Sequence, residues 1–554
     1  MVRDVPLSNR RRDITAVVFL GLIGVGIPLW LAASAGAIGL PTIDDWVYMR
    51  GAENLFRDGR LVMGGHSAAS IGQLLLVQPL LWVSGGDPWA FTAFGLVMTF
   101  VGLAATYLLA RRFIGTGSAI LVVLLLEAVP GFARISVSFM TDIPACSLAI
   151  LCLLLGTIWL DQGRRSVLVA TLVVGLLGVS IREFALAAPV TILVAGWARS
   201  RPGERTLLMA ASGLFVAGFV AILLGAGSAD RGVGATSGGL EHLILIGPAF
   251  TTLAAVVLPA LALGIGGRMR SLRPEHLVLG FGLVGLVLVM PYGPIVGGLW
   301  MSNGVVGNAL LSGTRDPVIG DPAWGLSQQL ALFAGSLLAA LCIGWISSNL
   351  RSTGEGGSAM TRALRILRGS DGVLMLFVVL NAAELVAFAG IGGILDRYLL
   401  PIVPVAAILL LGGQGPSTIG RRHALAHGAL AWLAISSALL TTNSFAYDSA
   451  RWRAGQAAVA LGYSPEVVDA GYEWVGYHAD GGKLGGDGLP YRSWYYEIIP
   501  AESPCAVISN GAIVDPDVVL IHVDAAAYRQ YLFFGPEQPL YLFGATSAGC
   551  APTS

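Results

Sequence analysis

Two adjacent carboxylates, Asp44 and Asp45, directly follow the first long apolar segment of a chain that is otherwise poor in charge. Where a helix leaves a bilayer, such a pair can bind a divalent metal ion or take a proton from a substrate. One of the two could also cap the short helix that follows, because a helix N-terminus favours negative charge. A cap needs only one carboxylate, so the second one favours a catalytic site.

A third carboxylate, Asp142, lies in the stretch Met140-Thr-Asp-Ile-Pro144 between two apolar segments. Thr or Asp followed shortly by Pro is also typical of the start of a helix. If Asp142 shares a face with Asp44 and Asp45, three hard oxygen donors meet at one depth, as Mg²⁺ or Mn²⁺ and a phosphate-bearing substrate would require. We expect Asp44 and Asp142 to be the ligands if such a metal binds.

Two arginines interrupt apolar hairpins at their turns: Arg182, which is followed by Glu183, and Arg397, which is followed by Tyr398. They could snorkel to the interface or pair with carboxylates to lock helices together. For Arg182 and Glu183, the sequence supports this structural alternative and a role in the site equally. Arg397 is more suggestive. A guanidinium at the end of a membrane helix suits bidentate contact with a lipid-linked phosphate.

Two further residues of the same region could contact a substrate. Tyr48 lies four residues after Asp44, on the same face of an interface helix, and could equally anchor that helix at the membrane surface. His66 falls in the same external loop and could complete a metal site, although a lone loop histidine is more often solvated. Farther along, Tyr472-Glu473-Trp474 is an aromatic-acid cluster that could stack on sugars or form the core of a small domain docked on the loops.

The composition excludes an ordinary soluble domain. Of the 554 residues, 55% are hydrophobic and only 12% are charged, which is typical of a polytopic membrane protein. The 33 basic and 33 acidic residues cancel, so no overall positive field would recruit nucleic acid. We therefore expect membrane lipids as partners and no nucleic acid.

Fourteen segments are apolar enough to be candidate membrane helices. They lie at about 14–40, 68–84, 89–110, 117–133, 145–160, 166–181, 184–198, 206–227, 243–264, 275–292, 325–346, 371–392, 398–414 and 424–441. Together they predict an all-α polytopic membrane bundle, residues 1–441.

The arginine clusters of five loops fall on the cytoplasmic side if the loop at Asp142 is outside and every later segment crosses. Asp44 should be outside as well, because the first helix leaves the cytoplasm. Three segments separate Asp44 from Asp142, so one of them, with 68–84 and 117–133 the weakest, is expected not to cross. The prediction is about 13 transmembrane helices in the cell (inner) membrane, with a cytoplasmic N-terminus and an extracytoplasmic C-terminus.

The composition changes near residue 442, where aromatic, acidic and glycine residues become more frequent. Short apolar runs at 505–509 and 518–523 predict buried strands, and 525–532 predicts a helix between strands. Residues 442–554 are therefore expected to form a small extracytoplasmic α/β domain. Cys505 and Cys550 are its only cysteines, and a disulfide between them is expected if the domain faces an oxidising compartment.

Three stretches resemble motifs of a known family. They are Asp44-Asp-Trp-Val-Tyr48, Met140-Thr-Asp-Ile-Pro144 and Asp396-Arg-Tyr-Leu-Leu-Pro401. Together they are similar to the polyprenyl-phosphate-dependent glycosyltransferases with the GT-C fold, namely the bacterial relatives of protein O-mannosyltransferases and the lipid A aminoarabinose transferases. The resemblance implies a GT-C-like bundle and an inverting hexosyl- or pentosyltransferase. The donor would be a polyprenyl-phosphate-linked sugar, and the acceptor a lipid, glycan or protein of the cell envelope.

The resemblance also implies roles for individual residues. Asp44 would be the general base, Asp45 and Asp142 would contact the metal or the acceptor, and Arg397 would contact the donor phosphate. One departure matters: many members have Lys-Pro-Pro before the second helix, whereas this chain reads Ser67-Ala-Ala-Ser-Ile-Gly-Gln73. Neutralisation of the phosphate must then come from arginine, from His66 or from a metal.

Two other classes of function remain open from the sequence. A secondary transporter would use membrane-edge carboxylates to carry protons or Na⁺, and it predicts charges near the bilayer midplane and a two-fold repeat. Most charges here lie at segment ends, and no repeat is visible. A non-catalytic membrane scaffold with a sensing outer domain is the other alternative.

Overall fold

The computed structural model describes most of the chain. The described residues are 10–61, 70–200, 202–227, 244–268, 273–289, 294–295, 305–306, 316–317, 321–351, 367–392, 394–412, 421–479, 494–497, 499, 501–511, 513, 518–530, 532–546 and 550. His66, one of the predicted substrate contacts, lies outside them.

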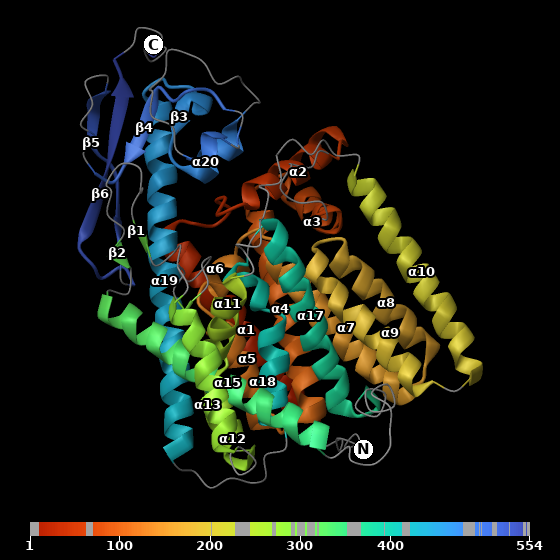
Figure 1. Ribbon diagram of the computed structural model, residues 1–554. Coiled ribbons are helices and arrows are strands. Elements are labelled where there is room, and N and C mark those ends of the chain that lie inside the picture. The colour runs from red at the N-terminus through yellow and green to blue at the C-terminus, as the bar shows by residue number, and fades with distance from the viewer. Residues whose placement is uncertain are drawn as a thin grey trace.

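Among the described residues up to 460, helices predominate (Figure 1). Up to residue 268 they are α1 (Arg10–Ala35), α2 (Asp45–Asp58), α3 (Ile71–Ser84), α4 (Trp89–Phe113), α5 (Thr116–Glu127), α6 (Phe132–Ser136), α7 (Asp142–Gln162), α8 (Arg165–Val179), η2 (Glu183–Leu186), α9 (Ala187–Arg199), α10 (Pro202–Gly227), α11 (Ile246–Val256) and α12 (Leu258–Arg268). Then follow α13 (Pro274–Gly285), η5 (Leu286–Val289), α15 (Asp321–Arg351), α17 (Ser370–Gly392), η6 (Asp396–Leu399), α18 (Ile402–Leu411) and α19 (Arg421–Ala460).

Six helices in the described part of the chain are long and apolar enough to cross a membrane, or seven if the pair α11 and α12, bent by 66°, is one span. They carry exposed apolar side chains on their outer faces, among them Trp30, Leu214 and Leu224. Such a surface suits lipid and not water. The chain is a multi-pass membrane protein, and the predicted number of thirteen crossings remains a prediction.

Glycines and large aromatic side chains hold the bundle together. The fully buried rings of Phe91 and Phe139 pack at a centroid distance of 4.7 Å between α4 and the segment that leads to α7. On α4, a Cβ at Gly95 would lie 2.6 Å from the carbonyl oxygen of Ser136, so only glycine allows this approach. The segment that carries Asp142 is thereby fixed against α4.

One end of the bundle faces the C-terminal sheet, and we call it the sheet end (Figure 1). The helix α3 begins and finishes there. At its start the N–H of Gly72 donates to the carbonyl oxygen of Ser180 at 3.1 Å, and shortly after its end Thr92 accepts a hydrogen bond at 3.1 Å from the N–H of Gly39, which follows α1. With 14 residues, α3 is about 21 Å long, and both of its ends lie at the sheet end. This position favours 68–84 as the segment that does not cross, and the assignment stays a prediction.

Arginines gather at the opposite end of the bundle. The guanidinium of Arg111, in the last turn of α4, lies 3.0 Å from the carboxylate of Asp13 near the start of α1. The neighbouring Arg112 pairs with Asp161 at the end of α7. Because α4 joins the two ends, the chain reaches Asp142 again at the sheet end by way of α5 and α6.

The C-terminal domain grows directly out of α19. This helix has 40 residues and runs without a break across the predicted boundary between 441 and 442 (Figure 1). It is followed by η7 (Pro465–Val467), β3 (Val468–Asp469), α20 (Tyr472–His478), η8 (Trp494–Glu497), β4 (Ala506–Ser509), β5 (Val518–Arg529) and β6 (Glu537–Ala545); β1 (Val305–Val306) and β2 (Asp316–Pro317) form a separate antiparallel pair.

The sheet of this domain has the order β3-β4-β6-β5, with β3 parallel to β4 and the other pairs antiparallel. The predicted helix at 525–532 is wrong, because residues up to Arg529 belong to β5. The run of alanines there favours a helix, but pairing with β6 and the 3.0 Å ion pair between Arg529 and Glu537 override that preference. Cys505 and Cys550 form a disulfide, with their Cα atoms 5.1 Å apart.

Candidate active site

Asp44 lies at the sheet end of the bundle, on a tight turn between α1 and α2. Its neighbour Ile43 has φ 58°, in the left-handed region that β-branched residues avoid at a cost of about 1–3 kcal/mol. The Asp44 carboxylate is held at both oxygens: Oδ2 lies 3.0 Å from Nη2 of Arg397, and Oδ1 accepts a hydrogen bond of 3.0 Å from the hydroxyl of Tyr472. Its side chain remains 34% exposed, so the carboxylate is still accessible to a substrate.

Asp142 begins α7 and is completely buried. One nitrogen of Arg182, Nη1, donates to Asp142 Oδ2 at 3.3 Å and to the hydroxyl of Thr141 at 2.6 Å. On the other side, Nε of Arg397 lies 3.8 Å from Oδ1 of Asp142. Arg397 therefore lies between the two carboxylates, Asp44 and Asp142, and joins them into one site.

The two arginines remain cations. Burial lowers the pKa of Arg397, but the carboxylates of Asp142 and Asp44 outweigh that effect and raise the pKa above its ordinary value. The pKa of Arg182 is raised in the same way, against burial, by Asp142. Two guanidinium groups held by two carboxylates form a preorganised anion site at the edge of the bundle.

Two tyrosines complete this arrangement. The guanidinium of Arg182 lies 4.8 Å from the ring centroid of Tyr398, and that of Arg397 lies 5.7 Å from it. Tyr48 is buried on α2, and its hydroxyl is close enough to interact electrostatically with Arg182. The structure thus brings together Asp44, Asp142, Arg182, Arg397, Tyr398 and Tyr48 from four separate parts of the chain.

Asp45 differs from the prediction that placed it beside Asp44 in a reactive role. Its side chain is completely buried, and its carboxylate accepts hydrogen bonds from the N–H and hydroxyl of Thr42 and, at 3.2 Å, from the N–H of Phe139. Burial raises the pKa of Asp45 well above its usual value, although the two N–H donors oppose this. The residue ties the Asp44 turn to the segment just before Asp142, and its oxygens are not open to a substrate.

Glu183 begins η2, a short turn that contacts α17. Its predicted role as a substrate contact remains a prediction.

A divalent metal fits this site poorly. Among the described residues, no group of three or more His, Cys, Asp or Glu side chains could hold a metal ion. Asp44 and Asp142, the predicted ligands, both face Arg397, and a metal between them would have to displace that guanidinium. The charge that a metal would supply is already supplied by the arginines.

Sequence reasoning gave Tyr472 only an open role, as a sugar contact or a core residue. It lies 428 residues from Asp44 in sequence, yet its hydroxyl contacts that carboxylate. Thr141, which binds Arg182, was part of the motif around Asp142 but was not singled out. Both residues carry a hydroxyl group that can bind a charged side chain, but the sequence does not show which one. The folded structure shows the partners, Asp44 for Tyr472 and Arg182 for Thr141.

Comparisons with known proteins give a family match and distant structural likenesses. Residues 74–227 match the family model described as dolichyl-phosphate-mannose-protein mannosyltransferase, a stretch that includes Asp142 and Arg182. The match confirms, for this part of the chain, the resemblance indicated by the motifs. No curated protein matches the chain.

Solved structures show distant likenesses. Two crystal structures of ArnT from Cupriavidus metallidurans, one in the apo state and one bound to undecaprenyl phosphate, align at 12% identity over 96% of this chain and 99% of their own, with a TM-score of 0.40. The apo oligosaccharyltransferase of Archaeoglobus fulgidus aligns at 12% identity over 89% of this chain and 64% of its own, with a TM-score of 0.42.

Proposed function

We propose that this protein is a membrane glycosyltransferase that moves a sugar from a polyprenyl-phosphate donor to an acceptor of the cell envelope. One observation carries the proposal: Arg397 joins a half-open carboxylate, Asp44, to a buried one, Asp142, at the end of an apolar helix bundle. A base beside an anion site at a lipid edge is what transfer from a lipid-linked phosphate needs. The family match over residues 74–227 supports the same assignment.

The arginines would bind the leaving group. As the bond between the anomeric carbon and the phosphate oxygen breaks, the phosphate keeps the electron pair and gains negative charge. Arg397, with Arg182 behind it, supplies fixed positive charge at that point. The missing Lys-Pro-Pro motif is thereby compensated by guanidinium groups that buried carboxylates hold in place.

Asp44 would accept the proton of the acceptor. The acceptor hydroxyl oxygen attacks the anomeric carbon and transfers its proton to the exposed carboxylate of Asp44. Arg397 and Tyr472 fix both oxygens of this carboxylate. With the base and the leaving phosphate on opposite faces of the sugar, a single displacement inverts the anomeric centre. Whether the sugar is a hexose or a pentose is set by contacts that this site does not specify.

The membrane arrangement follows from the arginine-rich end of the bundle. Arg111, Arg112 and Arg199 lie at the end opposite the sheet, and positive loop residues face the cytoplasm. The site and the C-terminal domain would then face outward from the cell (inner) membrane. The polyprenyl chain would lie in the lipid beside the bundle, and the sugar would lie under the C-terminal domain.

The transporter and scaffold alternatives fit the geometry less well. A transporter needs its coupling charges near the bilayer midplane, whereas Asp44, Asp142, Arg182 and Arg397 meet at one end of the helices. A scaffold has no need of a buried arginine and a buried carboxylate beside an exposed one, since buried charges carry a large desolvation cost.

The proposal is tested by donor affinity. Protein reconstituted in vesicles should transfer a labelled sugar from polyprenyl phosphate to cell-envelope acceptors, and free polyprenyl phosphate should inhibit as a product. In Arg397→Gln the inhibitor constant should rise about 10- to 100-fold, the size expected for lost charge-assisted hydrogen bonds, and Arg397→Lys should recover part of it.

Arg453→Gln is the matched control, because Arg453 is an exposed arginine whose bonds go to Ser449 and Ala527. It should inhibit and transfer like the wild type. Absence of transfer by the wild type with any polyprenyl-phosphate sugar would rule out the function, and unchanged inhibition in Arg397→Gln would remove the arginine from the donor site.

A further inference from the structure

We propose that the C-terminal domain supplies two positioning residues, Tyr472 and Glu473, which hold the Asp44 turn in the conformation that transfer requires. By the Asp44 turn we mean residues 42–45. The inference rests on the proposed function and deepens it, because it makes the outer domain part of the catalytic site. Nothing in the sequence motifs assigns such a role to either residue.

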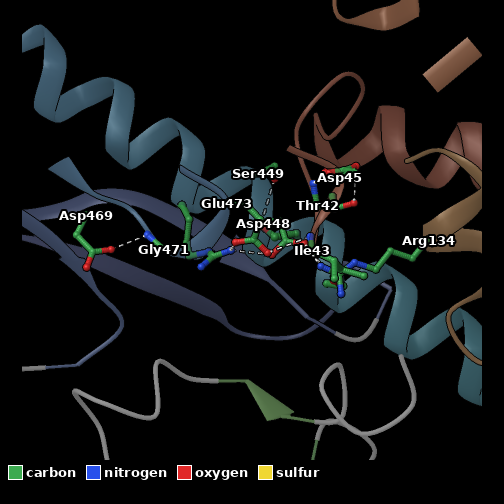
Figure 2. Close-up of polar contacts among 12 residues, drawn as sticks. Thr42, Ile43, Asp45, Arg134, Asp448, Ser449, Asp469, Gly471 and Glu473 are labelled. Atoms are coloured by element: carbon green, nitrogen blue, oxygen red, sulfur yellow. Dashed lines mark hydrogen bonds and ion pairs between the residues drawn. The ribbon is translucent and has the colours of Figure 1, made fainter. Parts of the chain in front are cut away.

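Glu473 acts on the strained backbone of the turn. Its Oε1 accepts a hydrogen bond of 3.2 Å from the N–H of Ile43, the residue with φ 58° (Figure 2). A β-branched residue in that conformation persists only where its surroundings fix it. The bond to Glu473 comes from outside the bundle, and it fixes the peptide that places the Asp44 carboxylate toward Arg397.

Glu473 is itself fixed by a chain of buried ion pairs. Its Oε2 lies 2.6 Å from Nη2 of Arg451, which lies 3.3 Å from Oδ1 of Asp448, and Oδ2 of Asp448 lies 2.7 Å from Nη2 of Arg134 (Figure 2). Arg451 and Asp448 belong to α19, and Arg134 belongs to α6. The chain thus runs from the bundle through α19 into α20 and back to the Asp44 turn.

Tyr472 acts on the reactive carboxylate itself. Its hydroxyl donates to Asp44 Oδ1 while Arg397 donates to Oδ2, so the two partners together set the rotation of the carboxylate. The ring of Tyr472 packs edge-on against Trp46 at 5.9 Å, which fixes the hydroxyl in turn. Burial and the nearby Asp44 carboxylate raise the pKa of Tyr472, so the hydroxyl remains a donor throughout the physiological range.

The first turn of α20 is built to present both residues. It begins after Gly471, which has φ 102° and where a Cβ would collide with the guanidinium of Arg451. The Gly471 N–H donates to Asp469 at 2.9 Å, which fixes the start of the helix (Figure 2). Tyr472 and Glu473 are adjacent in sequence, and they reach the carboxylate and the preceding peptide of the same turn.

A merely structural role, in which α20 docks the domain on the bundle, makes a different prediction. Tyr477 provides the matched control for docking, because its hydroxyl donates to Glu53 of α2 at 2.8 Å. This bond is of the same kind as the bond from Tyr472 to Asp44, and it joins α20 to the helix that follows the Asp44 turn. It lies away from Asp44, however, so its loss affects docking alone.

The experiment compares Tyr472→Phe, Glu473→Ala and Glu473→Gln with Tyr477→Phe in two readouts. The first is amide hydrogen exchange of residues 42–48 in the reconstituted full chain. The second is kcat and KM for transfer. We expect Glu473→Ala to speed exchange in this segment about tenfold, and Tyr472→Phe and Glu473→Ala to lower kcat about tenfold with KM changed less than twofold.

Glu473→Gln keeps one acceptor oxygen but places an NH2 group where the second oxygen was, so it can serve the Ile43 N–H or Arg451 but not both, and it should fall between Glu473→Ala and the wild type in both readouts. Tyr477→Phe should change neither readout by more than about twofold. The inference is overturned if Glu473→Ala leaves exchange unchanged, or if Tyr472→Phe and Glu473→Ala lose no more activity than Tyr477→Phe. If the wild type transfers no sugar, the proposed function fails, and the exchange data still decide whether Glu473 holds the turn.

Discussion

At the scale of single residues, Asp44 and Asp45 show how neighbours can do different work. The helix α2 begins at Asp45, so the two side chains point in different directions, and one is 34% exposed while the other is buried completely. The sequence predicted the acids, and it predicted Arg397 as the contact for the donor phosphate. The sequence could not show that Asp44 is accessible and Asp45 structural. The hydrogen bonds that Asp45 accepts come from Thr42 and from Phe139, which is 94 residues away.

Replacement of Asp45 by alanine should therefore destabilise the protein. The change leaves the N–H groups of Thr42 and Phe139 buried without an acceptor, at a cost of about 1–3 kcal/mol for each. Thermal unfolding in detergent should show a clearly lower Tm for Asp45→Ala and a much smaller decrease in Tm for Asp44→Ala. Unchanged stability of Asp45→Ala together with lost transfer would show that Asp45 acts on the substrate.

At the scale of elements, the position of α3 bears most directly on the predicted topology. The sequence predicted that one of three early segments does not cross, and it marked 68–84 and 117–133 as the weakest without choosing between them. Contacts far apart in sequence, from Gly72 to Ser180 and from Gly39 to Thr92, favour 68–84. The predicted helix at 525–532 failed for a similar reason, since pairing of β5 with β6 is a tertiary effect that alanine content does not show.

Accessibility labelling tests the position of α3. Cysteines placed at Ile71 and Ser84, the partly exposed first and last residues of α3, should both react with a membrane-impermeant reagent from the side that labels a cysteine at Asp58. A cysteine at Thr116, the start of α5, should react only from the opposite side. Labelling of positions 71 and 84 from opposite sides would show that α3 spans the membrane.

At the scale of the whole molecule, the bundle and the C-terminal domain are joined by a continuous helix and by buried ion pairs. Composition predicted both parts and the change near residue 442. It did not predict that α19 continues through the boundary as a single 40-residue helix, about 60 Å long. A chain of ion pairs from Arg134 through Asp448 and Arg451 to Glu473 also links the two parts. Local sequence patterns do not show such long-range pairs.

The stability of the whole molecule should depend on pH through Asp469. Burial raises the pKa of Asp469 in β3, against the hydrogen bonds from Tyr495 and from the Gly471 N–H. The folded state then binds the proton more tightly than the unfolded chain. Its contribution to stability is complete below the unfolded pKa, about 4, and is lost as the pH rises through the folded pKa.

Asp469→Asn keeps an oxygen for both hydrogen-bond donors, which share Oδ1, and carries no charge. The difference in Tm between this variant and the wild type should therefore grow in favour of the variant as the pH is raised from about 4 to about 8. Asp58→Asn, at the exposed end of α2, should show no such trend. A difference that stays constant with pH would contradict a raised pKa at Asp469.

The central claim is that Asp44 acts as the base in a site whose arginines bind the donor phosphate. Its most direct test is transfer by Asp44→Asn, measured together with inhibition by polyprenyl phosphate and compared with Asp58→Asn. We predict that kcat falls about 10²- to 10⁴-fold while the inhibitor constant changes little, because Asn keeps the contact geometry but accepts no proton. Transfer by Asp44→Asn at the rate of the wild type would contradict the account.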